Sequence, residues 1–150
     1  MNSVELNWQY QNPFIESVCV TENVIDGLNH TNNTAYVKWC EIAAWQHSDE
    51  LGLGLEDYKK LNRAMAIVKA DYQYLQATRL GQELMVGTWL VACDGKLSCE
   101  RKFEIKRKQD GQTVTKGTWH LICIDIATGK PKRMPRIFND IYGAAVVVAY

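Results

Sequence analysis

The stretch Asp26-Gly-Leu-Asn-His-Thr-Asn-Asn-Thr-Ala-Tyr36 joins a strand-like segment to a helix-like one. The segment before it, residues 15–25, is rich in Val, Ile, Thr and Cys, which favours a strand that ends at the Asp-Gly turn. Thr31, Asn32 and Asn33 carry side chains that can accept hydrogen bonds from the free amides of a first helical turn. The stretch therefore predicts a strand, a turn and a helix start in succession.

The segment that follows, residues 34 to about 50, contains no Gly or Pro and predicts a long helix that Gly52 and Gly54 end. Its apolar side chains fall on nearly every side of the helix, so we expect other elements to enclose it. These residues are Ala35, Tyr36, Val37, Trp39, Cys40, Ile42, Ala43, Ala44 and Trp45.

After a short helical turn at residues 56–62, the apolar pattern changes from helical to strand-like. Turn signals at Leu80-Gly81, Asp94-Gly95 and Asp110-Gly111-Gln112 separate four predicted strands, which are residues 66–75, 83–92, 97–108 and 113–126. In part of residues 101–107 apolar and polar side chains alternate, which indicates a sheet with one face buried and one exposed. The later half therefore predicts an antiparallel meander.

This order of elements predicts an α+β domain and suggests the hot-dog fold, in which an antiparallel sheet wraps around a central helix. A length of 150 residues suits one domain, which we expect to cover residues 1–150. The apolar tail, residues 142–150, is too short to span a membrane, and we interpret it as a packing or subunit-contact segment.

Composition and cysteine usage exclude several classes of protein. Apolar residues make up 47% and charged residues 23%, as in ordinary globular proteins. No apolar run is long enough to span a membrane and no export signal stands at the N-terminus, so we expect a cytoplasmic protein. The five cysteines form no Cys-x-x-Cys pair and lie mostly among apolar residues, so we expect buried thiols, with no metal site and no disulfide framework.

The net charge of zero conceals a split along the chain. Residues 1–58 contain nine acids and one base, whereas residues 59–150 contain sixteen bases and eight acids. Clusters such as Lys106-Arg107-Lys108 and Lys130-Pro-Lys-Arg133 fit either a surface for a polyanion or a solvated strand face and a basic turn. No nucleic-acid-binding motif accompanies these bases, so nucleic acid is not an expected partner.

Asp26 stands just before a predicted helix N-terminus, whose amides carry partial positive charge. The amides around Asn32 and Asn33 can polarise a carbonyl oxygen, while the carboxylate attacks the carbonyl carbon or deprotonates a water. This chemistry suits a thioester, because a thiolate leaves without strong acid assistance. The same residues also fit a structural turn and helix cap. His30 fits an acid, a base, a substrate-orienting donor or a histidine that holds the loop.

The motif Asp26-x-x-Asn-His-Thr-Asn-Asn-x-x-Tyr36 is similar to the Asp-x-x-Gly-His-Val-Asn-Asn-x-x-Tyr signature of the 4-hydroxybenzoyl-CoA thioesterase-like, single-hot-dog acyl-CoA thioesterases. Three later blocks resemble the same family, and together the four cover about residues 15–135. They are Trp39-Cys-Glu-Ile-Ala43, the stretch from Asp71-Tyr-Gln-Tyr to Gly-Gln-Glu-Leu84, and Asp125-x-x-Thr-Gly-Lys-Pro-x-Arg-x-Pro135.

By this resemblance Asp26 matches the family's catalytic carboxylate, as nucleophile or general base. Asn33 matches the residue whose backbone amide polarises the thioester carbonyl. His30, Asn32 and Tyr36 would bind the substrate in the same site.

Four further positions bear on the resemblance. Glu41 fits either a role in a neighbouring active site or a buried acid with hydrogen-bond partners. Asn29 stands where the signature has Gly, and Asn tolerates left-handed backbone geometry. Val24 stands where many relatives carry a further Asp, and Gln76 replaces a usual Pro.

The resemblance implies hydrolysis of an acyl-CoA to a free acid and CoA, with no cofactor, because CoA is part of the substrate. An acyl-carrier-protein thioesterase and a non-catalytic acyl-CoA-binding module stay open as alternatives. It also implies a homodimer or homotetramer, in which exposed strand edges pair. The type of acyl group stays open, as does the contact with the CoA phosphates, for which the candidates are Arg79, Arg101, Lys106 and Arg107.

Overall fold

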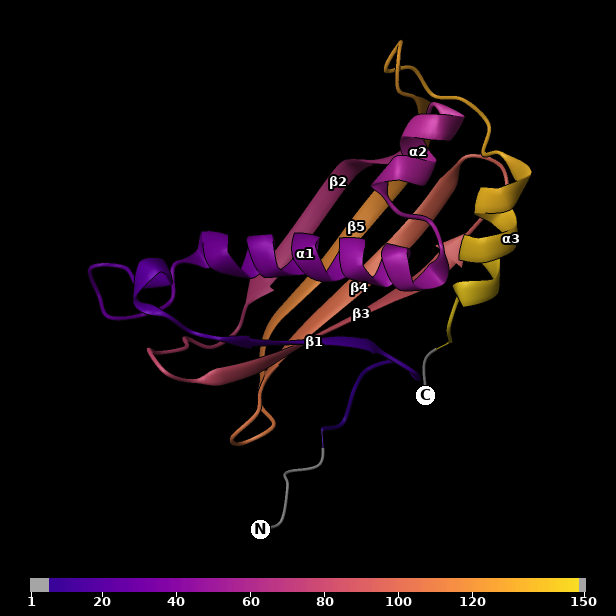
Figure 1. Ribbon diagram of the computed structural model, residues 1–150. Helices are drawn as coiled ribbons and strands as arrows, with labels where there is room; N and C mark the ends of the chain where they lie inside the picture. Colours follow the sequence, from indigo (N-terminus) through magenta and orange to yellow (C-terminus); the bar gives the residue numbers. More distant parts are fainter. Residues whose placement is uncertain (1–5, 149–150) are drawn as a thin grey trace.

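The computed structural model describes residues 6–148, which form a five-stranded antiparallel sheet with the helix α1 lying across one face (Figure 1). The strands lie side by side in the order β1-β3-β4-β5-β2, so β1 and β2 are the two edges. The elements are β1 (Phe14–Cys19), α1 (Asn33–Leu51), α2 (Leu55–Leu61), β2 (Arg63–Tyr74), β3 (Glu83–Cys93), β4 (Ser98–Arg107), β5 (Thr113–Asp125) and α3 (Arg136–Ala145). This arrangement confirms the predicted α+β class. No helix within these residues is long and apolar enough to cross a membrane.

The helix α1 packs on the sheet along one side. Its buried residues are Ala35, Tyr36, Cys40, Ala43, Ala44 and Ser48. Ile42 and Trp45 are exposed, so the expectation of a helix enclosed on every side is wrong within a single chain. At its end, Gly52 adopts a φ of 100°, the left-handed geometry in which glycine has no steric cost.

Two predicted segments differ from the structure. The strand expected over residues 15–25 stops at Cys19, because Cys19 pairs with Glu83, the first residue of β3, and no strand lies opposite the residues that follow. Instead of a continued strand, residues 20–25 contain a single 3-10 turn, Glu22–Val24. The tail expected over residues 142–150 begins inside α3, which buries Phe138 and Tyr142, whereas residues 149–150 lie outside the described part of the chain.

The N-terminal segment covers the outer face of the sheet, opposite α1. The ring of Trp8 lies over Gly87, where a Cβ atom would come within 2.7 Å of it, and packs edge-on against Trp89 at 5.9 Å between ring centroids. Glu104 and Lys106 lie beneath this segment and are only 4% and 5% exposed. The alternation in residues 101–107 therefore does not mark an exposed polar face, because both faces of β4 are covered.

The buried charges on this face satisfy one another. Lys106 Nζ lies 3.5 Å from Glu104 Oε2 and donates to Thr113 Oγ1 at 2.9 Å. Thr113 in turn donates to Glu104 Oε2 at 2.7 Å, and the backbone amide of Gln9 donates to Oε1 at 3.0 Å. Such pairing offsets the cost of removing two charges from water.

The cysteines match the expectation of buried thiols only in part. Cys40 and Cys123 are buried thiols, as expected, and burial raises the pKa of the Cys40 thiol well above its ordinary value. Cys19 is exposed. Cys93 and Cys99 are directly opposite each other in the β3–β4 pair and form a disulfide, which contradicts the expectation of thiols throughout. Only the strand register places these two residues together.

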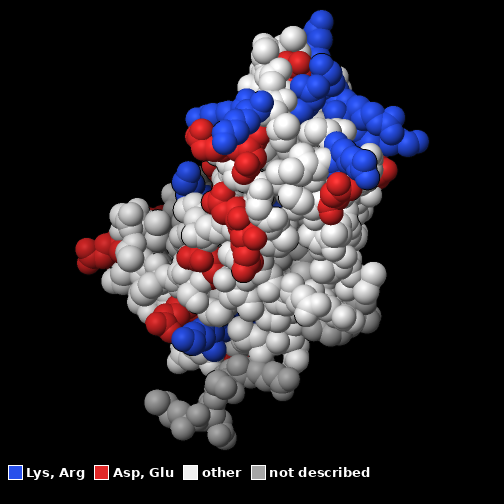
Figure 2. All heavy atoms as spheres, turned by 45° about the vertical axis from the view of Figure 1, so that its right-hand side comes forward, with Lys and Arg blue, Asp and Glu red and all other residues white. Residues whose placement is uncertain are grey.

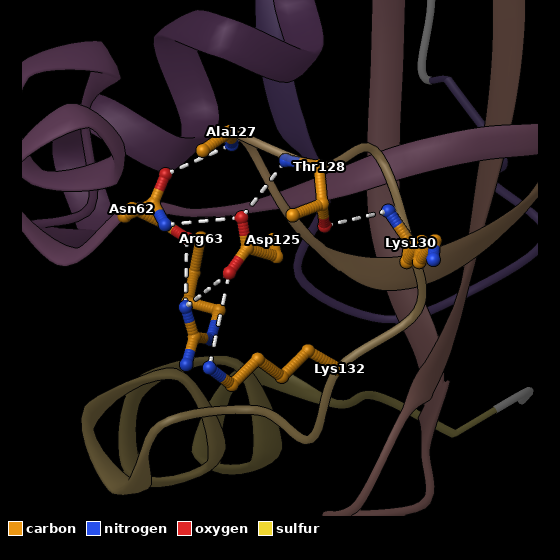
Figure 3. A network of polar contacts seen from close by, with 7 residues as sticks. All are labelled: Asn62, Arg63, Asp125, Ala127, Thr128, Lys130 and Lys132. Carbon is orange, nitrogen blue, oxygen red and sulfur yellow. Dashed lines mark hydrogen bonds and ion pairs between the residues drawn. The ribbon is translucent and has the colours of Figure 1, made fainter.

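The turn after β5 is organised by Asp125, as Figure 3 shows. Its Oδ1 accepts from the Thr128 amide at 3.0 Å and from Asn62 Nδ2 at 3.1 Å, and these bonds hold the pKa of this carboxyl below its usual value. Its Oδ2 lies 3.7 Å from Arg63 Nη1 and 3.8 Å from Lys132 Nζ. Asp125, at the end of β5, therefore ties this turn to Asn62 and Arg63, which connect α2 to β2.

Replacing Glu104 by Ala tests the buried pair. We expect Glu104→Ala to lower the free energy of unfolding by about 3–5 kcal/mol in urea titrations, since Lys106 stays buried without a carboxylate. Glu83→Ala removes the partner of the exposed Lys108 and should cost less than about 1 kcal/mol. The double variant Glu104→Leu with Lys106→Met should recover much of the loss. Equal effects of Glu104→Ala and Glu83→Ala would contradict this account.

Candidate functional site

The loop of residues 26–31 is closed by its own hydrogen bonds. The Asp26 amide donates to the carbonyl of His30 at 2.8 Å, and Asn29 adopts a φ of 63°, as predicted for the position where relatives carry Gly. Asp26 Oδ1 accepts from the amides of Leu28 at 2.8 Å and His30 at 3.2 Å. The other oxygen, Oδ2, has no hydrogen-bond partner among residues 6–148. One oxygen thus fixes the carboxylate and the other stays available.

The start of α1 leaves one backbone donor unpaired. Asn32 caps the helix, because its Oδ1 accepts from the Thr34 amide at 3.0 Å. The amides of Asn32 and Ala35 also donate within the protein, to the carbonyls of Val24 and Asn32. The amide of Asn33 has no acceptor in the described part of the chain, as is usual for the first residue of a helix. It is a free donor at the positive end of α1.

Three hydroxyl groups pin this helix start to the segment between β2 and β3. Thr31 Oγ1 lies 2.6 Å from Thr78 Oγ1, and the Tyr36 hydroxyl lies 2.7 Å from the same atom. The Thr31 amide also donates to the carbonyl of Thr78 at 2.9 Å. All three residues are buried, so the hydroxyls exchange hydrogen bonds instead of bonds to water. Tyr36, expected to bind substrate, has its hydroxyl engaged in this cluster.

A cavity of about 250 Å³ opens beside this cluster. Of the residues predicted for the site, Asp26, His30, Asn33 and Tyr36 line it, whereas Asn32 does not. The structure adds residues that the sequence analysis did not assign to the site: Thr31, Tyr74, Leu75, Gln76 and Ala77. Most of them follow β2, within a block that already resembled the thioesterases. Around this cavity and elsewhere in residues 6–148, no three His, Cys, Asp or Glu side chains are placed to hold a metal ion.

A second cavity, of about 330 Å³, lies under the later half of α1. Glu41 lines this cavity and not the first, since it is eight residues from Asn33 and thus about 12 Å along the helix. Arg101 also lines it and donates from Nη1 to His47 Nδ1 at 2.9 Å. Because Arg101 can only donate, His47 Nδ1 accepts this hydrogen bond and carries no proton. Burial of His47, together with the positive charge of Arg101, lowers the pKa of His47 to about 4.

One cluster of exposed bases lies away from the first cavity. Figure 2 shows Lys and Arg concentrated at the end of the molecule that carries α2 and the turn after β5. The exposed bases of α2, of the turn after β5 and of the first position of α3 are Lys59, Lys60, Lys130, Lys132, Arg133 and Arg136. The loop of residues 26–31 lies at the opposite end of α1 (Figure 1), so this cluster does not border the Asp26 cavity.

A family model described as the thioesterase-like superfamily matches residues 20–143. The chain belongs to the thioesterase-like superfamily. The match includes both cavities and confirms the predicted enzyme class, a thioester hydrolase. A comparison with curated proteins finds no match.

Solved structures similar to this thioesterase-like protein confirm its hot-dog fold. The Staphylococcus aureus protein SAV2348, solved in complex with CoA, is 18% identical with a TM-score of 0.83, over 96% of this chain and 92% of that one. The DHNA-CoA thioesterase from S. aureus is 25% identical with a TM-score of 0.78, over 88% and 87%. The 12:0-ACP thioesterase from Umbellularia californica is 15% identical with a TM-score of 0.82, over 91% of this chain and 51% of that one.

The contact between His47 and Arg101 predicts a pH dependence of stability. The folded pKa of His47, about 4, lies below its ordinary value, so between pH 6.5 and 4 the unfolded chain binds more protons. The free energy of unfolding should therefore fall as the pH falls through this window. Urea titrations at pH 7, 6, 5 and 4.5 should show a shallower fall for His47→Gln than for the wild type. His120→Gln, which alters a histidine outside this contact, should follow the wild type, and a slope unchanged in His47→Gln would refute the assignment.

Proposed function

We propose that this protein hydrolyses an acyl-CoA to a free acid and CoA at the cavity beside Asp26. The observation that carries the proposal is the pairing of two free groups on one cavity: the Oδ2 atom of Asp26 and the unpaired amide of Asn33. A carboxylate and a directed N–H donor are what acyl transfer from a thioester requires.

In the proposed reaction the thioester carbonyl oxygen accepts from the Asn33 amide, which stabilises the negative charge of the tetrahedral intermediate. Asp26 Oδ2 either attacks the carbonyl carbon or takes a proton from a water that attacks it. The carbon–sulfur bond breaks and CoA leaves as the thiolate. If Asp26 is the nucleophile, water then hydrolyses the acyl-aspartate anhydride. His30 lines the same cavity and can orient the substrate.

The CoA portion has two candidate contacts beside the cavity. Arg79 is exposed two residues beyond the lining residue Ala77, and Arg107 donates from Nη2 to Gln76, another lining residue. Arg101 and Lys106 are buried and so are poor candidates for the CoA phosphates. The CoA bound to the similar structure of SAV2348 supports this ligand class.

An acyl-carrier-protein substrate is the second candidate, and the fold similarity to the 12:0-ACP thioesterase favours it. Competition separates the two, because CoA and its 3′,5′-ADP fragment should inhibit an acyl-CoA thioesterase and leave hydrolysis of an acyl-carrier-protein substrate largely unaffected.

We also propose that the protein pairs through β2 into a homodimer. This strand hydrogen-bonds to β5 on one side, and residues 67–71 are exposed in succession, which leaves a long edge open. Ile67 and Val68 add apolar surface there, with Val68 56% exposed. Tyr74, at the end of β2, lines the first cavity, so a partner would approach the site. A homotetramer would require a second interface.

Free-thiol release from acetyl, medium-chain, long-chain and aromatic acyl-CoAs tests the reaction. We expect turnover of one class, and a fall of at least about 10²-fold in kcat for Asp26→Asn, which keeps the shape of the side chain and removes its charge. Asn33→Pro removes the amide and should lower kcat by about 10²–10³-fold. Proline suits the first residue of a helix, and Asn32 has the extended backbone that a following proline requires.

Asn33→Ala is the matched control, because it keeps the amide and should retain wild-type turnover. Turnover that is indifferent to both Asp26→Asn and Asn33→Pro would refute the site. Binding of acyl-CoA without release of thiol from any ester, CoA or carrier protein, would favour a binding module.

Light scattering tests the dimer. We expect the wild type to have at least twice the 17.1 kDa mass of one chain at micromolar concentration. Val68→Lys places a charge at the open edge and should shift the protein to a monomer. Ile15→Lys, on the opposite edge strand β1, should leave the mass unchanged. A wild-type monomer, or dissociation caused by Ile15→Lys alone, would rule out pairing through β2.

A further inference from the structure

Arg101 is a buried cation without an acidic partner among residues 6–148. Its side chain lines the 330 Å³ cavity and the residue is only 3% exposed. Its hydrogen bonds come from Nη1 alone and reach two neutral groups, His47 Nδ1 at 2.9 Å and Thr88 Oγ1 at 3.1 Å. No carboxylate of residues 6–148 lies within 4.0 Å of it, whereas the buried Lys106 faces Glu104 at 3.5 Å.

A buried guanidinium of this kind is stabilised by a bound anion. Burial lowers the pKa of Arg101, to about 10, so the guanidinium stays charged at neutral pH. Removing an arginine from water is costly unless a negative charge and further acceptors meet it. Nε and Nη2 donate no hydrogen bond within the described residues, and a guanidinium with two free donors matches a carboxylate in a bidentate arrangement.

Three hydroxyl groups line the same cavity as Arg101 and add hydrogen-bonding capacity to it. The Tyr142 hydroxyl lies 2.9 Å from Ser48 Oγ and is hydrogen-bonded to the Tyr58 hydroxyl, and all three residues line the cavity. The two hydrogen bonds among these hydroxyls use two of their three protons, so one hydroxyl is left to donate to an anion beside Arg101. Glu41 also lines the cavity, but its side chain is half exposed and pairs with Lys38 at 3.7 Å. It is not the missing counter-ion.

The remaining walls are apolar. Met65, Leu121 and Trp119 form part of them, and the exposed Trp45 and Ile67 mark the side that opens to solvent. A ligand that fits this arrangement has an apolar chain and enters with its charged end first. A volume of about 330 Å³ lies within the usual range of small-molecule sites.

We infer that the cavity under the later half of α1 binds the carboxylate end of an apolar chain, with Arg101 as the side chain that recognises it. Two sources share this chemistry: the far carboxylate of a dicarboxylic acyl group carried on CoA, and a free fatty acid. The dicarboxylic acyl-CoA as ligand rests on the proposed function. Binding of a carboxylate in this cavity does not depend on it.

Calorimetry with even-numbered monocarboxylic acids from six to sixteen carbons, and with the matching alcohols, tests the site. We expect the acids to bind the wild type at least tenfold more tightly than the alcohols, and Arg101→Met to remove this preference. Arg101→Lys, which keeps the charge, should retain part of it. Ala44→Leu narrows the cavity without touching Arg101 and should weaken binding of every chain.

An acid preference that survives in Arg101→Met, or equal affinity of the wild type for acids and alcohols, would overturn the inference. If Arg101→Met does not fold, Ala44→Leu decides, because acids that bind it as tightly as the wild type must occupy another site.

Hydrolysis then separates the two sources. If the ligand is the substrate's far end, wild-type kcat/KM should be higher for a dicarboxylic acyl-CoA than for its monocarboxylic counterpart, and Arg101→Met should lower this ratio at least tenfold. Fatty-acid binding that depends on Arg101, with a ratio near one in both proteins, would assign the site to a free fatty acid. Absence of hydrolysis with any ester would refute the proposed function. The calorimetry would still test whether the cavity binds carboxylates through Arg101.

Discussion

The packing of α1 against one face of the sheet is the constraint on which both cavities depend. One side of the helix is buried, and its small residues, such as Ala43 and Ala44, bring the helix close to the strands. This contact places the start of α1 beside the segment after β2, where the hydroxyls of Thr31, Tyr36 and Thr78 join the two. It also places the later half of the helix across the cavity that Arg101 lines.

The two ends of α1 differ in how their polar groups are satisfied. At the start, Asn32 and the Asp26 loop engage the nearby amides and leave only the Asn33 N–H of this turn without a described acceptor. Under the later half, Arg101 is buried and its partners within the described part of the chain are neutral. On the other face of the sheet, Glu104 and Lys106 are fully paired. Unpaired polar groups that line a cavity, as Asn33 and Arg101 do, are candidates for contact with a ligand.

Several features could be predicted because they are local. The helix start at Asn32, its end at Gly52, the left-handed Asn29 and the hairpin turns each follow from the preferences of a few adjacent residues. The apolar spacing of Ile137, Phe138, Ile141 and Tyr142 also marks α3, which was not predicted; only its last residues, from Tyr142 on, were assigned, to an apolar tail. The length of β1 was not predictable in this way, because it depends on where β3 begins.

The sequence by itself determined the order of elements from β1 to β5, the fold class and the candidate pair Asp26 and Asn33, since these depend on local pattern and on a contiguous motif. Only the tertiary structure decided that Cys93 meets Cys99, that Glu104 and Lys106 are buried, and that no acid of residues 6–148 pairs with Arg101. The physical reason is that strand register and the covering of each sheet face arise from contacts between distant segments. In the local pattern of β4, a buried charge and a solvated one are indistinguishable.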